Sequence, residues 1–384
     1  MVQAQGTAPD AKDQKRSNNE KPSLSTTASG NQDACSTNGD DQVKRSLPSR
    51  LTCGIFDHLD DDGRDVARQY EDRLKLAEVC DSLGFYAYHL AEHHCTPHGR
   101  GPSPNLFLSS VAQRTQRLRV GPLVLLLNLY HPLRAFEEIC MLDQLSGGRL
   151  ELGIGRGSLP TEWGYFGVSA DAAPERYEEA SEILNAALKG HTLSYHGRFF
   201  ELSEIPLTMR PHQHPYPPTW ITSSRAESAE WAAANGANLA CLGRSSAVRN
   251  ISNAFRAHRA RITAGDDREP FIGLLRMVVI AQSDRDAHVT AETAYERWLD
   301  SFKFVYELNA IPTPPTLPLT FDAALESELC VVGTPASVRQ TLLNQMEEAG
   351  ANYLLCQLAF GNLPLEASLY TATTIRSEII ASFG

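Results

Sequence analysis

The chain has 384 residues, of which 42% are hydrophobic and 21% are charged, and this composition is typical of a soluble globular protein. The formal net charge of −11 argues against a nucleic-acid binder, which would carry a basic patch or stripe. The longest apolar stretch, residues 120–127, contains Pro122 and is far shorter than the roughly 20 residues that cross a bilayer as a helix.

The first 48 residues have the composition of a disordered tail. They are rich in Ser, Asn, Asp, Gln, Lys and Gly, and no aromatic residue precedes Phe56. Such a segment cannot bury enough apolar surface to offset the entropy lost on ordering. Its acidic residues argue against a transit peptide, and it lacks the apolar core of a signal peptide. We therefore predict a tail over residues 1–48 and one folded domain over residues 49–384.

The cysteines are scattered and form no C-x-x-C pair. In a large chain without a signal sequence, this distribution predicts reduced thiols in the cytoplasm and not a disulfide framework. The positions are 35, 53, 80, 95, 140, 241, 330 and 356.

Strand-like and helix-like segments alternate from Leu51 onward. The predicted strands are residues 51–58, 85–93, 118–127, 150–155, 219–223, 238–242, 271–281 and 352–359. The predicted helices include residues 66–83, 132–145, 174–188, 226–235 and 334–349. Several strand runs are apolar on both faces, as parallel strands covered by helices are. Eight such units predict an α/β fold, a (β/α)8 barrel with insertions, and a doubly wound sheet is the alternative. The insertions are residues 190–207, which resemble a hairpin, and the Pro-rich residues 310–329.

Three histidines and a glutamate crowd into "LAEHHCTPHG", residues 90–99, at the end of the second predicted strand. Active sites of such barrels form at the C-terminal ends of the strands, so a chemical role is favoured over a purely structural one. His89 and His93 would share a face on a regular strand and could bind a metal. However, the spacing is not H-E-x-x-H and no third ligand is evident, so we predict no metal site.

The fourth predicted strand ends in "GIGRGSLPTEW". Gly153, Gly155 and Gly157 give the spacing G-x-G-x-G, and "SLPTEW" is not expected to open a helix, so the dinucleotide fingerprint is absent. Arg156 suits a phosphate because its planar guanidinium donates paired hydrogen bonds. The alternative is a surface arginine in a Gly-rich turn.

The fifth predicted strand ends in "TSSRAESAEW", where Ser223, Ser224 and Arg225 lead into a helix that begins near Ala226. Hydroxyls and free backbone N–H groups at a helix start form an anion site. Capping by serine explains part of the pattern, but the helix dipole disfavours arginine at this position. A bound phosphate would explain the arginine.

Residues 85–235 resemble the bacterial luciferase-like family of flavin-dependent monooxygenases. The resemblance rests on "EHHCTPHG", on "VGPLVLLLNLYHPLRAFEEICMLDQLSGGRLELGIGRG" and on "SSRAESAEWAA", which occur in the family's order. It continues more loosely over residues 51–384 and includes "VVGTPASV" at 331–338. Only the predicted tail falls outside it.

The resemblance implies a TIM barrel that binds FMN at its C-terminal mouth. His93 matches the family's catalytic histidine, with Glu92 and His94 expected to orient it or the neighbouring strand ends. Leu123–Val124 matches a non-proline cis peptide that lies against the flavin ring. The phosphate-binding residues would be Arg156 and the turn around the fifth strand, namely Ser223, Ser224, Arg225 and Ser228.

The chain also departs from the family pattern. Gly155 stands near the flavin where the light-emitting members carry a reactive cysteine, which puts aldehyde luminescence in doubt but not oxygenation. Ser224 stands where some members have glutamate.

The activity implied by the resemblance is oxygenation of a small apolar organic substrate by reduced FMN and O2, through a flavin hydroperoxide. The sequence has no fingerprint for a nicotinamide dinucleotide beside the FMN site, so we expect a separate NAD(P)H-dependent flavin reductase as partner. We also expect a homodimer. Two alternatives stay open: a deazaflavin-dependent oxidoreductase on the same barrel, and a non-catalytic flavin-binding member. Loops set the substrate in such barrels and vary most within them.

Deleting residues 1–48 should leave the protein's stability and flavin affinity unchanged, because the segment holds almost no residues that could join a core. The melting temperature and the Kd for FMN of the truncated and full chains check this expectation. A clear loss of either would show that the tail belongs to the folded domain.

Overall fold

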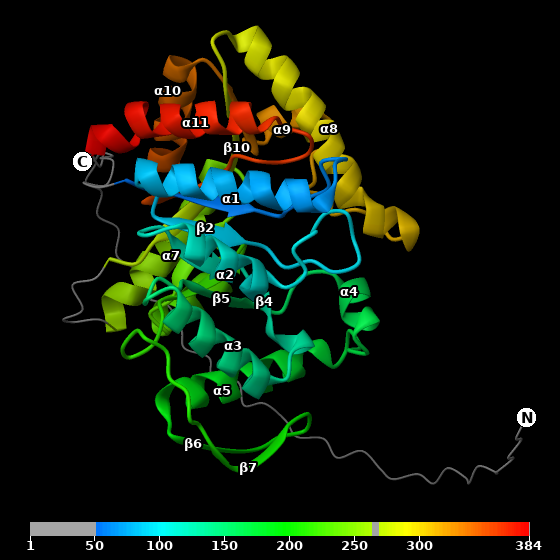
Figure 1. The fold of residues 1–384 in the computed structure, drawn as a ribbon, viewed down its shortest axis with the longest axis vertical. Helices are drawn as coiled ribbons and strands as arrows, with labels where there is room; N and C mark the ends of the chain where they lie inside the picture. Colours follow the sequence, from blue (N-terminus) through cyan, green and yellow to red (C-terminus); the bar gives the residue numbers. More distant parts are fainter. Residues whose placement is uncertain (1–50, 263–268, 384) are drawn as a thin grey trace, which may run out of the picture. The chain divides into compact units, whose positions relative to one another are not determined.

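The structure is a computed structural model that describes residues 51–262 and 269–383 (Figure 1). The predicted tail, residues 1–48, lies outside the described residues.

The described part of the chain is built on one ten-stranded sheet whose pairings are all parallel. Its strands are β1 (Thr52–Asp57), β2 (Ala87–Leu90), β3 (Arg119–Pro122), β4 (Leu125–Leu126), β5 (Leu152–Gly155), β8 (Thr219–Ser223), β9 (Asn238–Cys241), β10 (Ile272–Ile280), β11 (Cys330–Gly333) and β12 (Tyr353–Gln357). The order is β3-β2-β1-β12-β10-β9-β8-β5-β4, and β11 pairs with β10 beside this path. A bridge between Val120 and Leu150 brings the two ends of the sheet together. The sheet is therefore a nearly closed barrel, as predicted, and not an open doubly wound sheet.

Helices surround the barrel. They are α1 (Val66–Leu83), α2 (Pro104–Arg114), α3 (Pro132–Leu145), α4 (Pro160–Tyr165), α5 (Ala173–Lys189), α6 (Ala226–Ala234), α7 (Ser245–Ile262), α8 (Asp284–Leu308), α9 (Phe321–Glu326), α10 (Pro335–Ala349) and α11 (Leu365–Glu378), with short 3-10 turns at Leu127–Leu129 and Ile380–Phe383. Neighbours in this outer ring contact one another from α10 through α11, α1, α2 and α3 to α5, and from α6 through α7 back to α10. Part of the ring, from α11 to α5, follows one side of the barrel in Figure 1.

Local sequence signals explain why the helices begin and end where they do. The Asp65 side chain accepts hydrogen bonds from the first-turn N–H groups of α1, and Gly84 ends that helix with a φ of 81°, where glycine is favoured. Helix α3 begins at Pro132, whose ring fixes a helical φ and whose missing N–H is not needed in the first turn. Both helices have the predicted bounds.

The strands are buried on both faces, as parallel strands between a barrel interior and a helical layer must be. All nine residues of β10 are buried. Inside the barrel, His89 Nε2 lies 3.1 Å from the Tyr353 hydroxyl, and the Trp220 indole N–H donates to Glu151. Gly54 leaves room for this packing, because a Cβ there would lie 1.7 Å from the Tyr353 hydroxyl oxygen.

Both predicted insertions are present. Strands β6 (Thr192–His196) and β7 (Glu201–Pro206) form the antiparallel hairpin expected in residues 190–207. The Pro-rich segment follows α8 and contains the short helix α9 before it reaches β11. We did not predict β11 as a strand, because its apolar run is only four residues long and directly precedes a helix.

Within the described residues, the seven cysteines are free, as expected of reduced thiols. No described helix is long and apolar enough to cross a membrane.

Candidate active site at the C-terminal mouth of the barrel

The histidine-rich segment follows β2 at the C-terminal end of the barrel. The strand ends at Leu90, so His93 and His94 lie in the loop after it and not on the strand. The loop then folds back on itself, because a Cβ at Gly99 would lie only 2.5 Å from the Cβ of His93. Glycine at this position therefore allows residues 93–99 to form a compact turn over the barrel end.

His93 is held by a buried carboxylate. Its Nδ1 lies 3.1 Å from Glu162 Oε1, and the same oxygen accepts the backbone N–H of His94 at 3.0 Å. The His93 side chain is 20% exposed and that of Glu162 is 1% exposed. A carboxylate only accepts hydrogen bonds, so the proton belongs on Nδ1 and Nε2 of His93 is left as the free acceptor.

Glu162 was missed from the sequence, and one expectation about its surroundings was wrong. "SLPTEW" does open a helix, α4 (Pro160–Tyr165), which begins with proline and has Glu162 in its first turn. Proline at the first helical position and an acid in the first turn are ordinary helix-start signals that could have identified it. The G-x-G-x-G spacing before α4 still does not match the dinucleotide fingerprint.

Glu92 and His94 hold neighbouring strand ends together and do not contact the His93 ring through a described hydrogen bond. Glu92 Oε1 lies 2.8 Å from His94 Nε2 and accepts the Tyr130 hydroxyl at 3.0 Å, while Oε2 accepts the Leu126 backbone N–H at 2.9 Å. The buried Glu92 thus ties the end of β2 to β4. We expected these residues to orient either His93 or the neighbouring strand ends, and the geometry favours the strand ends.

Two further histidines lie beside His93. His58 follows β1 and His98 lies in the loop after β2, with ring centroids 4.2 Å apart. Burial lowers the pKa of both imidazoles well below 6.5, and neighbouring histidines lower it further. His89, which we had paired with His93 from their spacing, instead bonds to Tyr353 inside the barrel.

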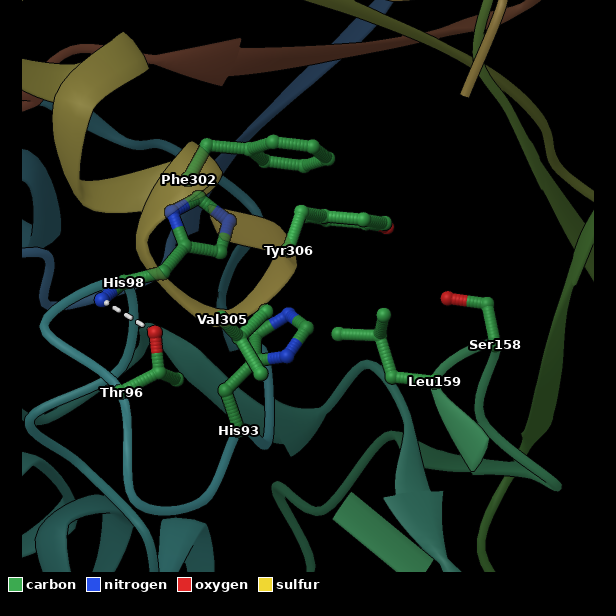
Figure 2. Close-up of a pocket in the computed structure, with 8 residues that line it drawn as sticks. All are labelled: His93, Thr96, His98, Ser158, Leu159, Phe302, Val305 and Tyr306. Carbon is green, nitrogen blue, oxygen red and sulfur yellow. Dashed lines mark hydrogen bonds between the residues drawn. The ribbon is translucent and has the colours of Figure 1, made fainter. Parts of the chain in front are cut away.

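A cavity of about 30 Å³ opens beside the His93 and His98 rings (Figure 2). Helix α8 supplies one wall through Phe302, Val305 and Tyr306, and Phe302 and Tyr306 stack with ring centroids 5.5 Å apart. Burial, and then the nearby Glu162, raise the pKa of the Tyr306 phenol. The cavity is therefore lined by two imidazole rings and by a mostly apolar, aromatic wall.

The peptide bond between Leu123 and Val124 is cis, at the position that the resemblance implied. Gly155, at the end of β5, packs directly against this segment, because a Cβ at Gly155 would lie 2.5 Å from Val124 Cγ2. A cysteine here would require Val124 to shift. The packing gives a physical reason for the glycine at this position.

The predicted phosphate-binding residues lie at two adjacent strand ends. Strand β5 pairs with β8, so Arg156, directly after β5, lies at the same rim as the turn after β8. Helix α6 starts after Arg225, whose side chain makes no capping hydrogen bond to the first N–H groups of the helix. Arg156, Ser224 and Arg225 are exposed, and Ser228 is half-buried. The Arg156 guanidinium lies 5.7 Å from the Trp163 ring centroid, over the helix that carries Glu162.

The C-terminal mouth of this parallel barrel carries acid–histidine pairs and arginine residues, and active sites of barrel enzymes lie at this end. The luciferase-like monooxygenase family matches residues 51–353, and the chain belongs to this family. The protein is therefore an enzyme of the flavin-dependent monooxygenase class.

Three known proteins illustrate the likeness. The uncharacterized protein y4wF of Sinorhizobium fredii is 66% identical over 342 residues, which is 89% of this chain and 100% of that protein. The oxygenase component of the flavin-dependent trigonelline monooxygenase of Acinetobacter baylyi is 28% identical over 245 residues, 62% of this chain and 67% of the relative. The oxygenating constituent of 3,6-diketocamphane monooxygenase from Pseudomonas putida, solved with FMN, has a TM-score of 0.72 at 18% identity. That match covers 86% of this chain and 98% of the neighbour and shows the shared fold.

Proposed function

We propose that the protein is the oxygenase of a two-component system, which uses reduced FMN and O2 to oxygenate a small apolar organic molecule. The observation that carries this proposal is the His93–Glu162 pair beside an apolar cavity, at the barrel mouth that also holds the basic turn.

The residues at this mouth fit FMN. Gly155 packs against the Leu123–Val124 segment without a side chain of its own, and we propose that the flat isoalloxazine ring lies against this segment. Arg156, Ser223, Ser224, Arg225 and Ser228 would hold the phosphate. The first N–H groups of α6 lie in the same turn, and they favour a negative charge. Bound reduced FMN would supply the electrons that activate O2 for oxygen transfer.

His93 would accept and return protons during oxygen transfer. Its free Nε2 is the acceptor, and Glu162 holds the ring in place through Nδ1. The aromatic wall from α8 would exclude water from the place where oxygen transfer occurs, which limits side reactions with water.

A separate NAD(P)H-dependent flavin reductase would deliver the reduced FMN. This part of the proposal is supported by the Acinetobacter relative, which is named as an oxygenase component, and by the absence of a dinucleotide fingerprint in this sequence. We also propose that the chain works as a homodimer in the cytoplasm.

The test is to mix the protein with reduced FMN and then with O2, in a stopped-flow spectrometer. We expect O2 consumption to precede the return of oxidised-FMN absorbance by a clear lag, because the aromatic wall would keep water away from the bound cofactor. No lag, together with tight binding of a reduced deazaflavin, would instead favour a deazaflavin-dependent oxidoreductase. Flavin binding without any O2 reaction would favour a non-catalytic member.

The Pro-rich stretch 312–318 is proposed as a lid over the barrel mouth. It follows α8, the helix that lines the cavity. The Tyr295 hydroxyl on α8 donates a hydrogen bond of 2.7 Å to the Pro318 carbonyl and so ties the end of the stretch to that helix. The stretch cannot form a regular helix, since its prolines lack N–H donors. Shortening it should leave a folded, flavin-binding protein that releases more hydrogen peroxide per O2 consumed. A peroxide assay with unchanged coupling would remove the lid role.

A further inference from the structure

His58, His93 and His98 form a cluster that the proposed oxygenation does not require as a whole. One ring nitrogen from each of the three lies within 4.8 Å of the others. The residues come from two adjacent strand ends, since β1 pairs with β2, and the back-folded loop then brings His98 to His58. No other group of three or more such side chains with this spacing occurs among the described residues.

His98 gives the strongest indication that the cluster binds a ligand. It is 4% exposed, and neither of its ring nitrogens has a hydrogen-bond partner. Its ring packs edge-on against Trp298 and Phe302, with centroids 5.5 and 4.9 Å away, so its apolar surface is satisfied while its nitrogens are not. A buried polar group without a partner costs free energy, which a bound ligand would offset.

We propose that His58, His93 and His98 bind one divalent transition-metal ion, with Zn²⁺ as the preferred occupant. Three imidazoles suit Zn²⁺, Co²⁺, Ni²⁺ or Cu²⁺ far better than Mg²⁺ or Ca²⁺, which prefer oxygen ligands. Zn–N bonds of about 2.0–2.1 Å in tetrahedral geometry place nitrogens roughly 3.3 Å apart, so the rings need only a small approach.

The groups behind two of the ligands fit this assignment. Glu162 accepts from Nδ1 of His93, the carboxylate–histidine arrangement that orients metal ligands. The Gln357 side-chain amide lies 3.2 Å from His58 Nδ1, and its oxygen and nitrogen can exchange places by a flip of the amide. With the oxygen facing His58, the amide would accept the Nδ1 proton and leave Nε2 for the metal.

A fourth coordination position is also available. The cavity of about 30 Å³ is lined by His93 and His98, and this volume exceeds the roughly 10–15 Å³ that one water molecule needs. Three histidines with one open position is the arrangement of catalytic zinc sites. In this protein a bound metal would occupy Nε2 of His93 and so block its proton transfer; this consequence alone rests on the proposed function.

The test measures metal binding to the flavin-free full chain, so it does not depend on any activity. The protein is stripped with a chelator, mixed with equimolar Zn²⁺ or Co²⁺, and passed through gel filtration before elemental analysis. We expect about one metal per chain and a visible Co²⁺ spectrum without a sulfur-to-cobalt charge-transfer band, because all protein ligands are nitrogens.

Two variants place the site. His98→Phe keeps an aromatic ring between Trp298 and Phe302 but removes both nitrogens, and His58→Gln is the second variant in case the first does not fold. Each should lower metal affinity at least about 100-fold, because the loss of an outer-shell group alone commonly costs about 10- to 100-fold. The matched control is His131→Phe, which replaces an exposed histidine that packs on Phe200, and it should bind like the wild type.

Cys95→Ser tests the competing ligand, because Cys95 is exposed in the same loop. This variant should also retain one metal. A stoichiometric metal retained by both cluster variants, lost in Cys95→Ser, or absent from the wild type after gel filtration would overturn the proposal.

Discussion

His93→Ala is expected to lower the oxygenation rate at least about 100-fold, since a general acid–base group typically contributes 10²- to 10⁴-fold. FMN affinity should change little, because the proposed phosphate turn lies beyond β5 and β8, on other strand ends. The measurement is single-turnover oxygenation with pre-reduced FMN, alongside the Kd for FMN. A chelator in the buffer keeps any metal bound by the histidine cluster from contributing to the difference.

Two companion variants separate the contributions around this ring. Glu162→Gln keeps an acceptor near Nδ1 but replaces the carboxylate by a neutral amide, whose hydrogen bond holds the ring less strongly, so we expect a smaller loss of rate. His94→Ala should be milder than His93→Ala, because the His94 ring bonds to Glu92 and is not among the residues that line the cavity. A His93→Ala enzyme that oxygenates at the normal rate would remove the catalytic assignment.

Eight strand runs and five of the eleven described α-helices could be predicted because their signals are local. Each of the eight predicted strand runs contains a barrel strand, and Asp65, Gly84 and Pro132 mark helix ends through interactions within a few residues. The burial of parallel strands on both faces also gives long apolar runs that are easy to find. Strand β11 was missed because four apolar residues beside a helix carry too little periodicity.

The site was harder to predict because its contacts join distant parts of the chain. Glu162 lies 69 positions from His93, and Gln357 lies 299 positions from His58. Spacing along the chain paired His89 with His93, but β2 ends at Leu90 and the backbone then turns, so the two rings face different surroundings. The actual neighbours of His93 depend on which strands are adjacent and on how the loop folds at Gly99. Neither can be read from residue spacing.

Arg156→Ala is expected to weaken FMN binding by roughly 1.5–3 kcal/mol, the range for a hydrogen bond to a charged group. This corresponds to about a 10- to 150-fold higher Kd. Riboflavin lacks the phosphate, so its affinity should be nearly the same for the wild type and the variant. Fluorescence titration with both flavins measures the difference directly.

Two controls separate the charge of Arg156 from its packing. The guanidinium lies over the Trp163 ring, so its removal could also disturb α4 and, through Glu162, the His93 ring. Arg156→Lys keeps the positive charge and should lose less FMN affinity than Arg156→Ala, though not none, because lysine cannot donate paired hydrogen bonds to a phosphate. Arg134→Ala, which removes an exposed arginine paired with Glu138 on α3, should bind both flavins normally. If Arg156→Ala weakened riboflavin as much as FMN, the arginine would act on the ring pocket through Trp163, and the phosphate assignment would be wrong.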